Sequence, residues 1–501
     1  MATAVNVEKK KNISPVIKNK KVISVFTLAL LNVALVVSLR SLPMMAEDGM
    51  SLIFFYVFGA LIFLIPSALI SAELATGWDD GKGVFTWVKE AFGEKFGFAA
   101  MFLQWVQNIA FYPIVLIFGA GAFAFIVTPE LAQNKFYMLA VILGVYWIST
   151  LINLRGVGLA SKISSIGVVL GTLIPAAVII LLGVAWFLGG NPSAIPMDAR
   201  NIIPEFSDLP KLALLVGALL TFAGMEVNAV HAKETKDPQK SFPKAMLLSS
   251  VMILVVFILG SLAVALIYNP SSPEAIAAGG QEMVAGMMVA FEQYFDHYGI
   301  GFLTPIFAIL LTIGVVAGVL AWVAGPSKGL FKAGREGLLP PVLQKANKNG
   351  VQVNILLIQG AIVTAFALFM LILPSIQDAY WIFTALTIQL YLIMYILMYA
   401  SALKLRYKRP DVKRAYTIPG GNLGMWIIAG IGITGAILGI VLGFIPANTE
   451  YYENALKDPM MFVSYALMLF IGISVFVLAP FVIHRFKKPS WKKEYTEAEM
   501  S

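Results

Sequence analysis

Two long apolar segments contain ionisable and helix-breaking residues, which are costly inside a membrane and therefore point to a functional site. The first segment, residues 23–44, carries Arg40 and Pro43 in its second half. The second segment, residues 209–231, carries Gly224 and Glu226 near its middle. An arginine binds carboxylates through paired hydrogen bonds, and a buried glutamate can bind and release a proton. These residue types predict ligand binding and proton transfer rather than covalent catalysis.

Each of these residues also has a structural explanation. Arg40 could extend to the outer headgroups, or it could pair with Glu47 or Asp48. Glu226 could form an ion pair with a lysine at the inner face of the membrane. The glycine and the proline could simply kink two packed helices.

The composition shows what kind of chain holds these residues. Of 501 residues, 59% are hydrophobic and 13% are charged, and the mean hydropathy is +0.83. A soluble domain is about 45–50% apolar and about a quarter charged. The apolar runs are roughly 20 residues long, which as α-helix matches the ~30 Å hydrocarbon layer of a bilayer. The alternation of a barrel strand is absent. We therefore predict an all-α integral membrane protein with about twelve transmembrane helices.

The distribution of charge predicts how the chain crosses the membrane. The predicted spans are residues 23–44, 51–74, 97–127, 137–153, 160–189, 209–231, 244–268, 301–331, 352–373, 378–402, 424–445 and 459–483. If the N-terminus is cytoplasmic, nearly all of the 36 lysines and arginines fall on the cytoplasmic side. This bias predicts a multi-pass protein of the inner (plasma) membrane with both termini cytoplasmic. It explains the net charge of +8 without nucleic acid, as topology signals and contacts with anionic lipid.

The two interrupted segments occupy matching positions in the chain. One is the first of spans one to five, and the other is the first of spans six to ten. This arrangement is typical of secondary transporters with inverted five-helix repeats. Helix N-termini at such breaks suit a carboxylate and free carbonyls suit an ammonium, so the breaks predict a site for an α-amino acid. We therefore divide the chain into a cytoplasmic tail (1–22), a transporter core (23–402, with repeats 23–189 and 209–402), helices eleven and twelve (403–484) and a second cytoplasmic tail (485–501).

Two stretches outside the spans are predicted to be helical. Residues 84–95 are amphipathic and are expected to lie on the inner surface between the second and third spans. Residues 269–300 form the longest outer loop, and a short helix is expected over residues 281–296.

Several features that resemble enzyme motifs are rejected. Residues 325–329 fit G-x-S-x-G and residues 430–435 fit G-x-G-x-x-G, but both lie in predicted membrane helices without the strands that those motifs need. The small residues of 430–435, like Gly314 and Gly318, instead predict close helix packing. The sequence has three scattered histidines and no cysteine. We therefore predict no catalytic residue, no metal site, no cofactor and no enzyme activity.

Four stretches of the sequence resemble a known group of transporters. Residues 222–226 carry an F-x-G-x-E motif, followed by Asp237-Pro238 and by Pro-Lys-Ala at 243–245. This pattern, and residues 321–354, resemble the amino acid–polyamine–organocation (APC) superfamily. Residues 321–354, 71–99 and 404–421 are most similar to its glutamate/γ-aminobutyrate antiporter family. The resemblance covers residues 22 to 484.

The resemblance implies a LeuT-like 5+5 inverted repeat with discontinuous first and sixth helices. Substrate would bind between spans one, three, six, eight and ten. The substrate-binding residues that it implies are Val37, Ser38, Leu39, Arg40, Ser41, Asn108, Thr221, Phe222, Ala223, Gly224 and Trp322. It assigns gating or proton coupling to Glu226, and it implies that Lys162 takes the place of a coupling sodium ion.

Three of the implied residues keep a structural alternative. Asn108 could be a hydrogen-bonding contact between helices, and Trp322 could serve ordinary packing. Lys162 could be a topology signal. The chain also departs from the glutamate/γ-aminobutyrate family, whose members usually carry aromatic and acidic residues before the first-span proline. Residues 39–42 here are Leu-Arg-Ser-Leu, so an identical substrate is not implied.

The resemblance implies a secondary active amino acid transporter. It would be an antiporter that exchanges a glutamate-like amino acid for its decarboxylation product, or for another amino acid, by alternating access. Its partners would be the substrate, the counter-substrate, the lipid bilayer and, for coupling, protons. Exchange against a decarboxylation product would export a proton equivalent and provide acid resistance. The alternative is a proton-coupled symporter or uniporter for neutral amino acids or amines.

Overall fold

The computed structural model describes residues 24–46, 48–78, 82–227, 238–268, 282–373, 375–447 and 449–492. The α-helices in these ranges are α1 (Val25–Val36), α2 (Ser41–Ala46), α3 (Leu52–Gly59), α4 (Ile65–Gly77), α5 (Val84–Phe92), α6 (Glu94–Ala124), α7 (Lys135–Leu154), α8 (Val157–Val168), α9 (Ile174–Leu188), α10 (Leu209–Phe222), α11 (Pro238–Ile267), α13 (Glu282–His297), α14 (Thr304–Ala333), α15 (Val353–Phe369), α16 (Ile376–Lys408), α17 (Gly421–Leu442), α18 (Thr449–Lys457) and α19 (Pro459–Arg485). The predicted tail 1–22, residues 493–501 of the second tail, and Glu47 lie outside the described residues.

All regular secondary structure in the described part of the chain is helical, as predicted. Ten of its helices are long and apolar enough to cross a membrane, and they correspond to ten of the predicted spans. The other two predicted spans, 23–44 and 209–231, are the ones expected to be interrupted. The structure divides the first into α1 and α2, and it ends the second helix early, at Phe222. The prediction of an all-α membrane protein with two discontinuous helices is confirmed.

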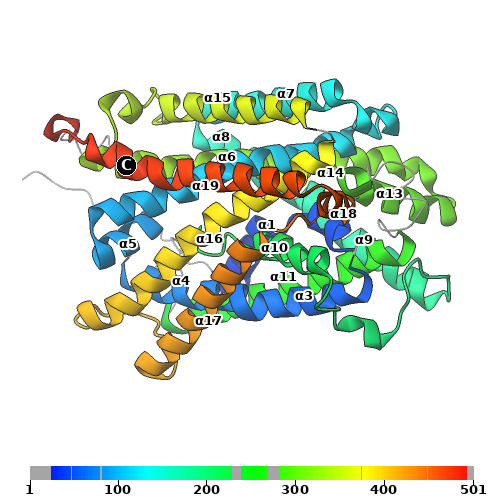
Figure 1. The fold of residues 1–501 in the computed structure, drawn as a ribbon, viewed down its shortest axis with the longest axis horizontal. Coiled ribbons are helices and arrows are strands. Elements are labelled where there is room, and N and C mark those ends of the chain that lie inside the picture. Colours follow the sequence, from blue (N-terminus) through cyan, green and yellow to red (C-terminus); the bar gives the residue numbers. More distant parts are fainter. Residues whose placement is uncertain are drawn as a thin grey trace, which may run out of the picture.

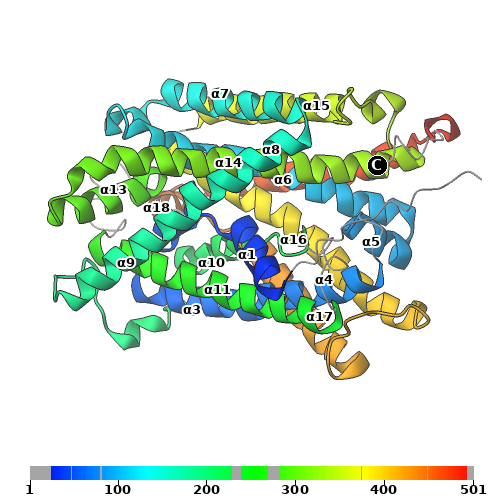
Figure 2. The same ribbon diagram turned by 180° about the vertical axis from the view of Figure 1, so that it is seen from behind.

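The spans form two groups of helices that face each other (Figures 1 and 2). Helices α1, α3, α4, α10 and α11 pack together in one group, which we name the bundle. Helices α6, α7, α14 and α15 pack together in the other group, which we name the scaffold. Helix α16 packs on both α6 and α10 and therefore contacts both groups. The bundle holds the first two spans of each repeat, and the scaffold holds the third and fourth spans of each, as in a LeuT-like fold.

The first break lies between α1 and α2. Helix α1 ends where the backbone becomes extended at Val37, with φ −69° and ψ 119°. The Ser41 hydroxyl, at the start of α2, donates a hydrogen bond of 2.8 Å to the carbonyl of Ser38. Pro43 follows in the first turn of α2, where its missing N–H removes no helical hydrogen bond. Residues 37–40 are therefore left as a non-helical segment in the middle of the bundle.

The second break follows α10. Ala223 is extended, with φ −72° and ψ 146°, and Gly224 has a φ of 114°. This positive φ is a conformation that residues with a Cβ rarely adopt. A Cβ at Gly224 would also lie 3.2 Å from the Trp322 ring. The positive φ and the close approach of the Trp322 ring together explain why residue 224 is a glycine.

Helices α5 and α13 lie at opposite ends of the molecule, which we name the α5 end and the α13 end (Figure 1). The predicted amphipathic helix forms as α5, but protein covers its apolar face. Phe85, Trp87 and Val88 are buried, and α5 packs on α6 and α16. The predicted helix in the 269–300 loop forms as α13; residues 269–281 lie outside the described part of the chain.

Two glycines bring α14 close to the π-helical turn Val169–Leu173 that joins α8 to α9. A Cβ on Gly314 would lie 2.3 Å from the carbonyl oxygen of Gly171, so no larger residue fits. The predicted packing role of Gly314 is confirmed. The same prediction is wrong for Gly318, because no described atom lies within 4 Å of a Cβ there. Gly318 lines the central cavity instead.

Candidate functional site

A cavity lies between the two breaks and the scaffold. It measures about 90 Å³, several times the roughly 10–15 Å³ that one water molecule needs on this measure. Its wall comes from the first break, α6, the α8–α9 junction, the end of α10, α14 and one residue of α16. These elements belong to spans one, three, five, six, eight and ten. The resemblance implied all of these spans except the fifth.

Most of the predicted substrate-binding residues line this cavity. They are Val37, Ser38, Leu39, Arg40, Asn108, Thr221, Ala223 and Trp322. The remaining predicted residues, Ser41, Phe222 and Gly224, lie next to the cavity but do not form its wall.

Arg40 is a buried cation beside the cavity. Its relative exposure is 2%, and its guanidinium carbon lies 5.2 Å from the centre of the Phe111 ring. Its Nη1 donates one long hydrogen bond, 3.3 Å, to the Tyr380 hydroxyl, and its Nε has no hydrogen-bond partner among the described residues. The predicted alternative pairing with Asp48 is not formed. In the part of the chain that the structure describes, no carboxylate pairs with Arg40; a buried arginine without such a partner is costly, so this position favours an anionic ligand.

Asn108 offers the cavity a hydrogen-bond acceptor, whereas Arg40 offers donors. The side chain is buried, and its Nδ2 donates a hydrogen bond of 2.9 Å to the backbone carbonyl of Gln104 on the same helix. Its Oδ1 has no partner among the described residues. Because the amide nitrogen is used within α6, Asn108 makes no described hydrogen bond to another helix, and its oxygen is an acceptor in the cavity wall.

Trp322 connects the cavity to the second break. Its ring contacts the Phe111 ring edge to face, with 6.0 Å between centres, and lies against Gly224. Phe111 in turn lies under the Arg40 guanidinium. Both aromatic rings line the cavity. Trp322 therefore lies against the break while it forms part of the wall.

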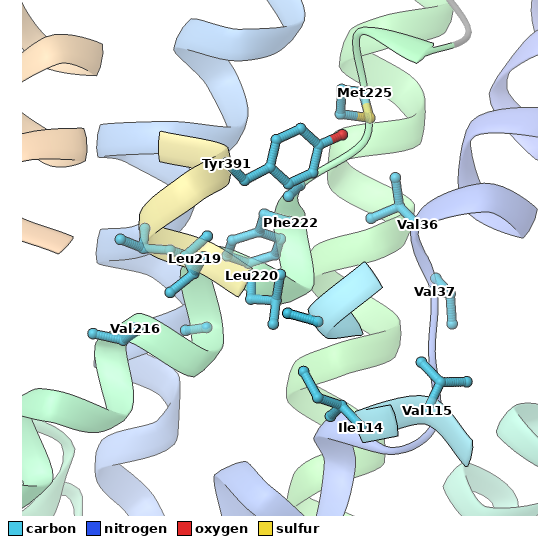
Figure 3. Close-up of a cluster of buried hydrophobic side chains, with 14 of the residues drawn as sticks. Val36, Val37, Ile114, Val115, Val216, Leu219, Leu220, Phe222, Met225 and Tyr391 are labelled. Carbon is cyan, nitrogen blue, oxygen red and sulfur yellow. The ribbon is translucent and has the colours of Figure 1, made fainter. Parts of the chain in front are cut away.

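Phe222 points away from the cavity into the bundle. It is fully buried, and its ring contacts the rings of Tyr56 and Phe257, each at 5.9 Å between centres. Figure 3 shows Phe222 among the apolar side chains of this region, with Leu219 and Leu220 nearby. Phe222 therefore anchors the end of α10 rather than facing a ligand.

Glu226 lies behind the cavity wall, two residues after the second break. It is 2% exposed, and its three side-chain hydrogen bonds to described residues come from neutral donors. The Tyr391 hydroxyl donates at 2.5 Å, the Gln104 Nε2 at 2.9 Å, and the Tyr395 hydroxyl donates to the other oxygen. The predicted alternative, an ion pair with a lysine, is not found among the described residues. Tyr395 also accepts a hydrogen bond of 2.9 Å from the Gly224 N–H, which ties the break to α16.

Tyr391 joins the cavity to Glu226. It is the residue of α16 that lines the cavity, and its hydroxyl extends toward the chain at Met225 (Figure 3). Sequence reasoning missed Tyr391, Tyr395 and Gln104. The signal was present, because tyrosines four residues apart on a predicted span share one helix face, and Gln104 is one helical turn before Asn108.

Lys162 lies apart from this site. It is on an exposed position of α8 and is not among the residues of the cavity wall. Its neighbour Ser164 is the residue that faces the scaffold, donating a hydrogen bond of 2.8 Å to the carbonyl of Ala317. The described contacts of Lys162 include neither the breaks nor Glu226.

Comparisons with known proteins agree with this arrangement. The family model for amino acid permeases matches residues 23–476. An uncharacterized transporter of Legionella pneumophila is 40% identical over 464 residues, which cover 93% of this chain and 97% of that protein. A glutamate/γ-aminobutyrate antiporter of Lactococcus lactis is 32% identical over 474 residues, 93% of this chain and 91% of that protein. A branched-chain amino acid permease of Lactococcus lactis is 26% identical over 324 residues, 61% and 65% of the two chains.

The family match spans both breaks, the cavity and nearly all of the helices, and these relatives are transporters or permeases. The protein is a multi-pass membrane transporter rather than an enzyme, and it belongs to the amino acid permease family of the APC superfamily.

Proposed function

We propose that this protein is an antiporter that exchanges an acidic amino acid for a second amino acid or for the decarboxylation product of the first. Substrate binds in the cavity between the two breaks, and the bundle moves against the scaffold to open that cavity to each side of the membrane in turn. The single observation that carries the choice of an acidic substrate is Arg40, which is buried beside the cavity and has no carboxylate partner among the described residues.

The polar groups of the cavity wall complement an amino acid with an extra carboxylate. The Nε of Arg40 and the Oδ1 of Asn108 have no hydrogen-bond partner among the described residues. The first can donate to a carboxylate, and the second can accept from an ammonium. Leaving either atom unpaired in a buried site is unfavourable, so a ligand that satisfies both is stabilised. The volume of about 90 Å³ leaves room for several non-hydrogen atoms.

The predicted gating role of Glu226 rests on the elements that its hydrogen bonds join. The carboxylate follows the second break in the bundle, while Gln104 comes from the scaffold and Tyr391 from α16. Binding a proton would convert one carboxylate oxygen from acceptor to donor and would weaken these contacts. We propose that protonation of Glu226 loosens the bundle from the scaffold. Lys162, which contacts neither, has no part in this proposed coupling.

We also propose that the α5 end faces the cytoplasm, in the plasma (inner) membrane, with both termini on that side. The support is the concentration of lysine and arginine at that end, including Lys82, Lys89, Arg406 and Arg409. The relative from Lactococcus lactis that exchanges glutamate for γ-aminobutyrate supports exchange against a decarboxylation product. Decarboxylation consumes a proton, so such exchange would remove acid from the cell.

Exchange can be tested with the purified protein in lipid vesicles. Labelled glutamate should enter vesicles that contain unlabelled glutamate or γ-aminobutyrate, and it should enter empty vesicles far more slowly. Uptake into empty vesicles at an equal rate would exclude obligatory exchange. Failure to transport any amino acid would exclude the proposed function.

The role of Arg40 can be tested by comparing acidic and neutral substrates. In Arg40→Gln, the apparent affinity for glutamate should fall on the order of 10- to 100-fold, as expected for a lost hydrogen bond to a charged group. The affinity for glutamine, which lacks the side-chain carboxylate, should change much less. Arg200→Gln, a substitution at an exposed outer arginine, is the matched control and should leave both unchanged. Equal loss for both substrates in Arg40→Gln would contradict recognition of a side-chain carboxylate.

The second candidate is proton-coupled symport, favoured by the environment of Glu226. A buried carboxylate whose described hydrogen-bond partners are all neutral is a site where a proton can be carried. In Glu226→Gln, exchange between equal amino acid pools should persist while uptake driven by a pH gradient should not. A wild-type protein that accumulates amino acid in empty vesicles under a pH gradient would favour symport over exchange.

A further inference from the structure

Two loops at the α5 end are held together by asparagine side chains. The Nδ2 of Asn347 donates a hydrogen bond of 2.7 Å to the carbonyl of Leu154, the last residue of α7. The Nδ2 of Asn349 donates one of 3.1 Å to the carbonyl of Arg155. Within the second loop, the Oδ1 of Asn347 accepts from the backbone N–H groups of Asn349 and Val351. The 345–351 turn is therefore ordered and fixed against the end of α7.

This attachment gathers basic side chains. Arg155 stands between α7 and α8, Lys348 lies between the two asparagines, and Lys345 precedes them. Lys162 follows on α8, five residues after that helix begins, which is roughly 8 Å along the helix axis. We name these four residues, Arg155, Lys162, Lys345 and Lys348, the basic patch.

The charges of the basic patch are exposed and have no acidic partner in the part of the chain that the structure describes. All four side chains are exposed, and no acidic side chain of the described residues lies within 4 Å of any of them. The sequence contains no Asp or Glu over residues 150–168 or 339–354. The acidic residue just before the second loop, Glu336, is already paired with Lys82 and Lys89. The carbonyls of Leu154 and Arg155, at the end of α7, already accept hydrogen bonds from the two asparagines.

Apolar surface continues from the basic patch along the spans. Ile148 and Leu151 on α7 are each 57% exposed, and Ile166 on α8 is 58% exposed. Lys162 is four residues before Ile166, so the two side chains share a face of α8. On α15, Leu357 and Ile358 are each 43% exposed. The patch therefore stands at the end of a surface that is suited to acyl chains.

We propose that the basic patch binds the phosphate group of an anionic phospholipid, whose acyl chains lie along the exposed faces of α7 and α8. Arginine and lysine donors bind phosphate oxygens, and each basic group near a membrane surface adds attraction to anionic lipid. A soluble anion would use the four cations but not the apolar faces. The combination of both features on one side of the molecule favours a lipid. The site is distinct from the transport cavity, so this inference does not depend on the proposed function.

Native mass spectrometry of the full-length protein in detergent can measure this binding. Phosphatidylglycerol and phosphatidylcholine with the same acyl chains are compared on wild type and on Arg155→Gln/Lys345→Gln/Lys348→Gln. The variant should bind phosphatidylglycerol on the order of 100-fold more weakly, as expected for the loss of three charges near the surface. Its binding of phosphatidylcholine should be unchanged. Retention of phosphatidylcholine binding also shows that the variant is folded.

A matched variant separates a defined site from general attraction. Lys413→Gln/Arg485→Gln/Lys488→Gln removes three exposed charges elsewhere at the same end and should keep full phosphatidylglycerol binding. Equal losses in the two variants would mean diffuse electrostatic attraction and would overturn the proposal. Displacement of the lipid by inorganic phosphate at similar concentration would mean a soluble-anion site and would also overturn it.

Discussion

The Arg406 guanidinium on α16 donates two hydrogen bonds, each 2.6 Å long, to the two carboxylate oxygens of Glu73 near the end of α4. The Arg414 Nε lies 3.4 Å from the same carboxylate, and the Ile418 N–H donates to it at 2.8 Å. Glu73 is 1% exposed. One carboxylate therefore joins the second span to the tenth span and to the loop that follows it.

Replacement of Glu73 should be strongly destabilising. Glu73→Gln leaves two arginines, whose side chains are only 9% and 7% exposed, without their charge partner, and breaking a buried pair costs about 3–5 kcal/mol. We expect a large fall in the melting temperature of the purified protein. Asp411→Asn removes one carboxylate of an exposed pair with Arg409 and should change the melting temperature little. Equal melting temperatures for the two variants would show that the Glu73 cluster does not stabilise the fold.

Gly224→Ala should be poorly tolerated because the position has a φ of 114° and faces Trp322. Strain of about 1–3 kcal/mol is expected from the backbone alone, and a shift of the tryptophan would alter the cavity wall. Exchange in vesicles should fall together with the melting temperature. The control is Gly325→Ala, a helical glycine with no described atom within 4 Å of its Cβ position. Full activity in Gly224→Ala would mean that the second break can adopt another conformation.

Tyr391→Phe keeps the ring in the cavity wall but removes the hydroxyl that donates to Glu226 at 2.5 Å. A hydrogen bond to a charged group contributes about 1.5–3 kcal/mol, so the maximal exchange rate should change on the order of 10-fold or more. The apparent substrate affinity should change less, because the ring remains. Tyr407→Phe, at an exposed tyrosine near the end of α16, should have neither effect. A change in affinity alone would instead assign the Tyr391 hydroxyl to substrate binding.

Gln359 joins three helices of the scaffold through its side chain. Its Oε1 accepts from the Trp105 indole N–H at 2.7 Å, and its Nε2 donates to the Tyr146 hydroxyl at 3.1 Å. Gln359→Leu would leave the indole N–H without a partner, which costs about 1–3 kcal/mol. The melting temperature should fall, whereas Ile358→Leu, at the adjacent exposed position, should leave it unchanged. An unchanged melting temperature in Gln359→Leu would contradict the stabilising role.

Glu292 on α13 should give stability a dependence on pH. Burial raises the pKa of Glu292, and the negative charge of Asp296 raises it further. The pKa of Glu292 in the folded state is therefore above its value in the unfolded chain, about 4.3. The contribution of Glu292 to stability is complete at pH values below the unfolded pKa, and it is lost as the pH rises through the folded-state pKa. The melting temperature should therefore respond less to pH in Glu292→Gln than in wild type.

The control for this measurement is Glu453→Gln, which changes an exposed carboxylate on α18. The melting temperature of this variant should depend on pH as that of the wild type does. The same pH dependence in wild type and both variants would show that Glu292 does not contribute to the pH dependence of stability.

The architecture could be predicted from the sequence because it depends on repeated, local signals. The lengths of the apolar runs predict the spans, since each helix satisfies its own backbone hydrogen bonds in lipid. Gly224 and the Arg40–Pro43 stretch predicted where two helices would break, and both breaks occur there. These properties need no knowledge of which helices pack together.

The site required the tertiary structure, because its contacts join residues far apart in the chain. The sequence singled out Glu226, but its partners come from α6 and α16 and were not identified. Phe222 and Lys162 matched the expected pattern, yet the first points into the bundle and the second lies on the exposed side of α8. Hydropathy alone does not say which way a side chain points on a helix whose faces are both apolar. The packing of the bundle on the scaffold decides that direction, and with it which side chains line the cavity.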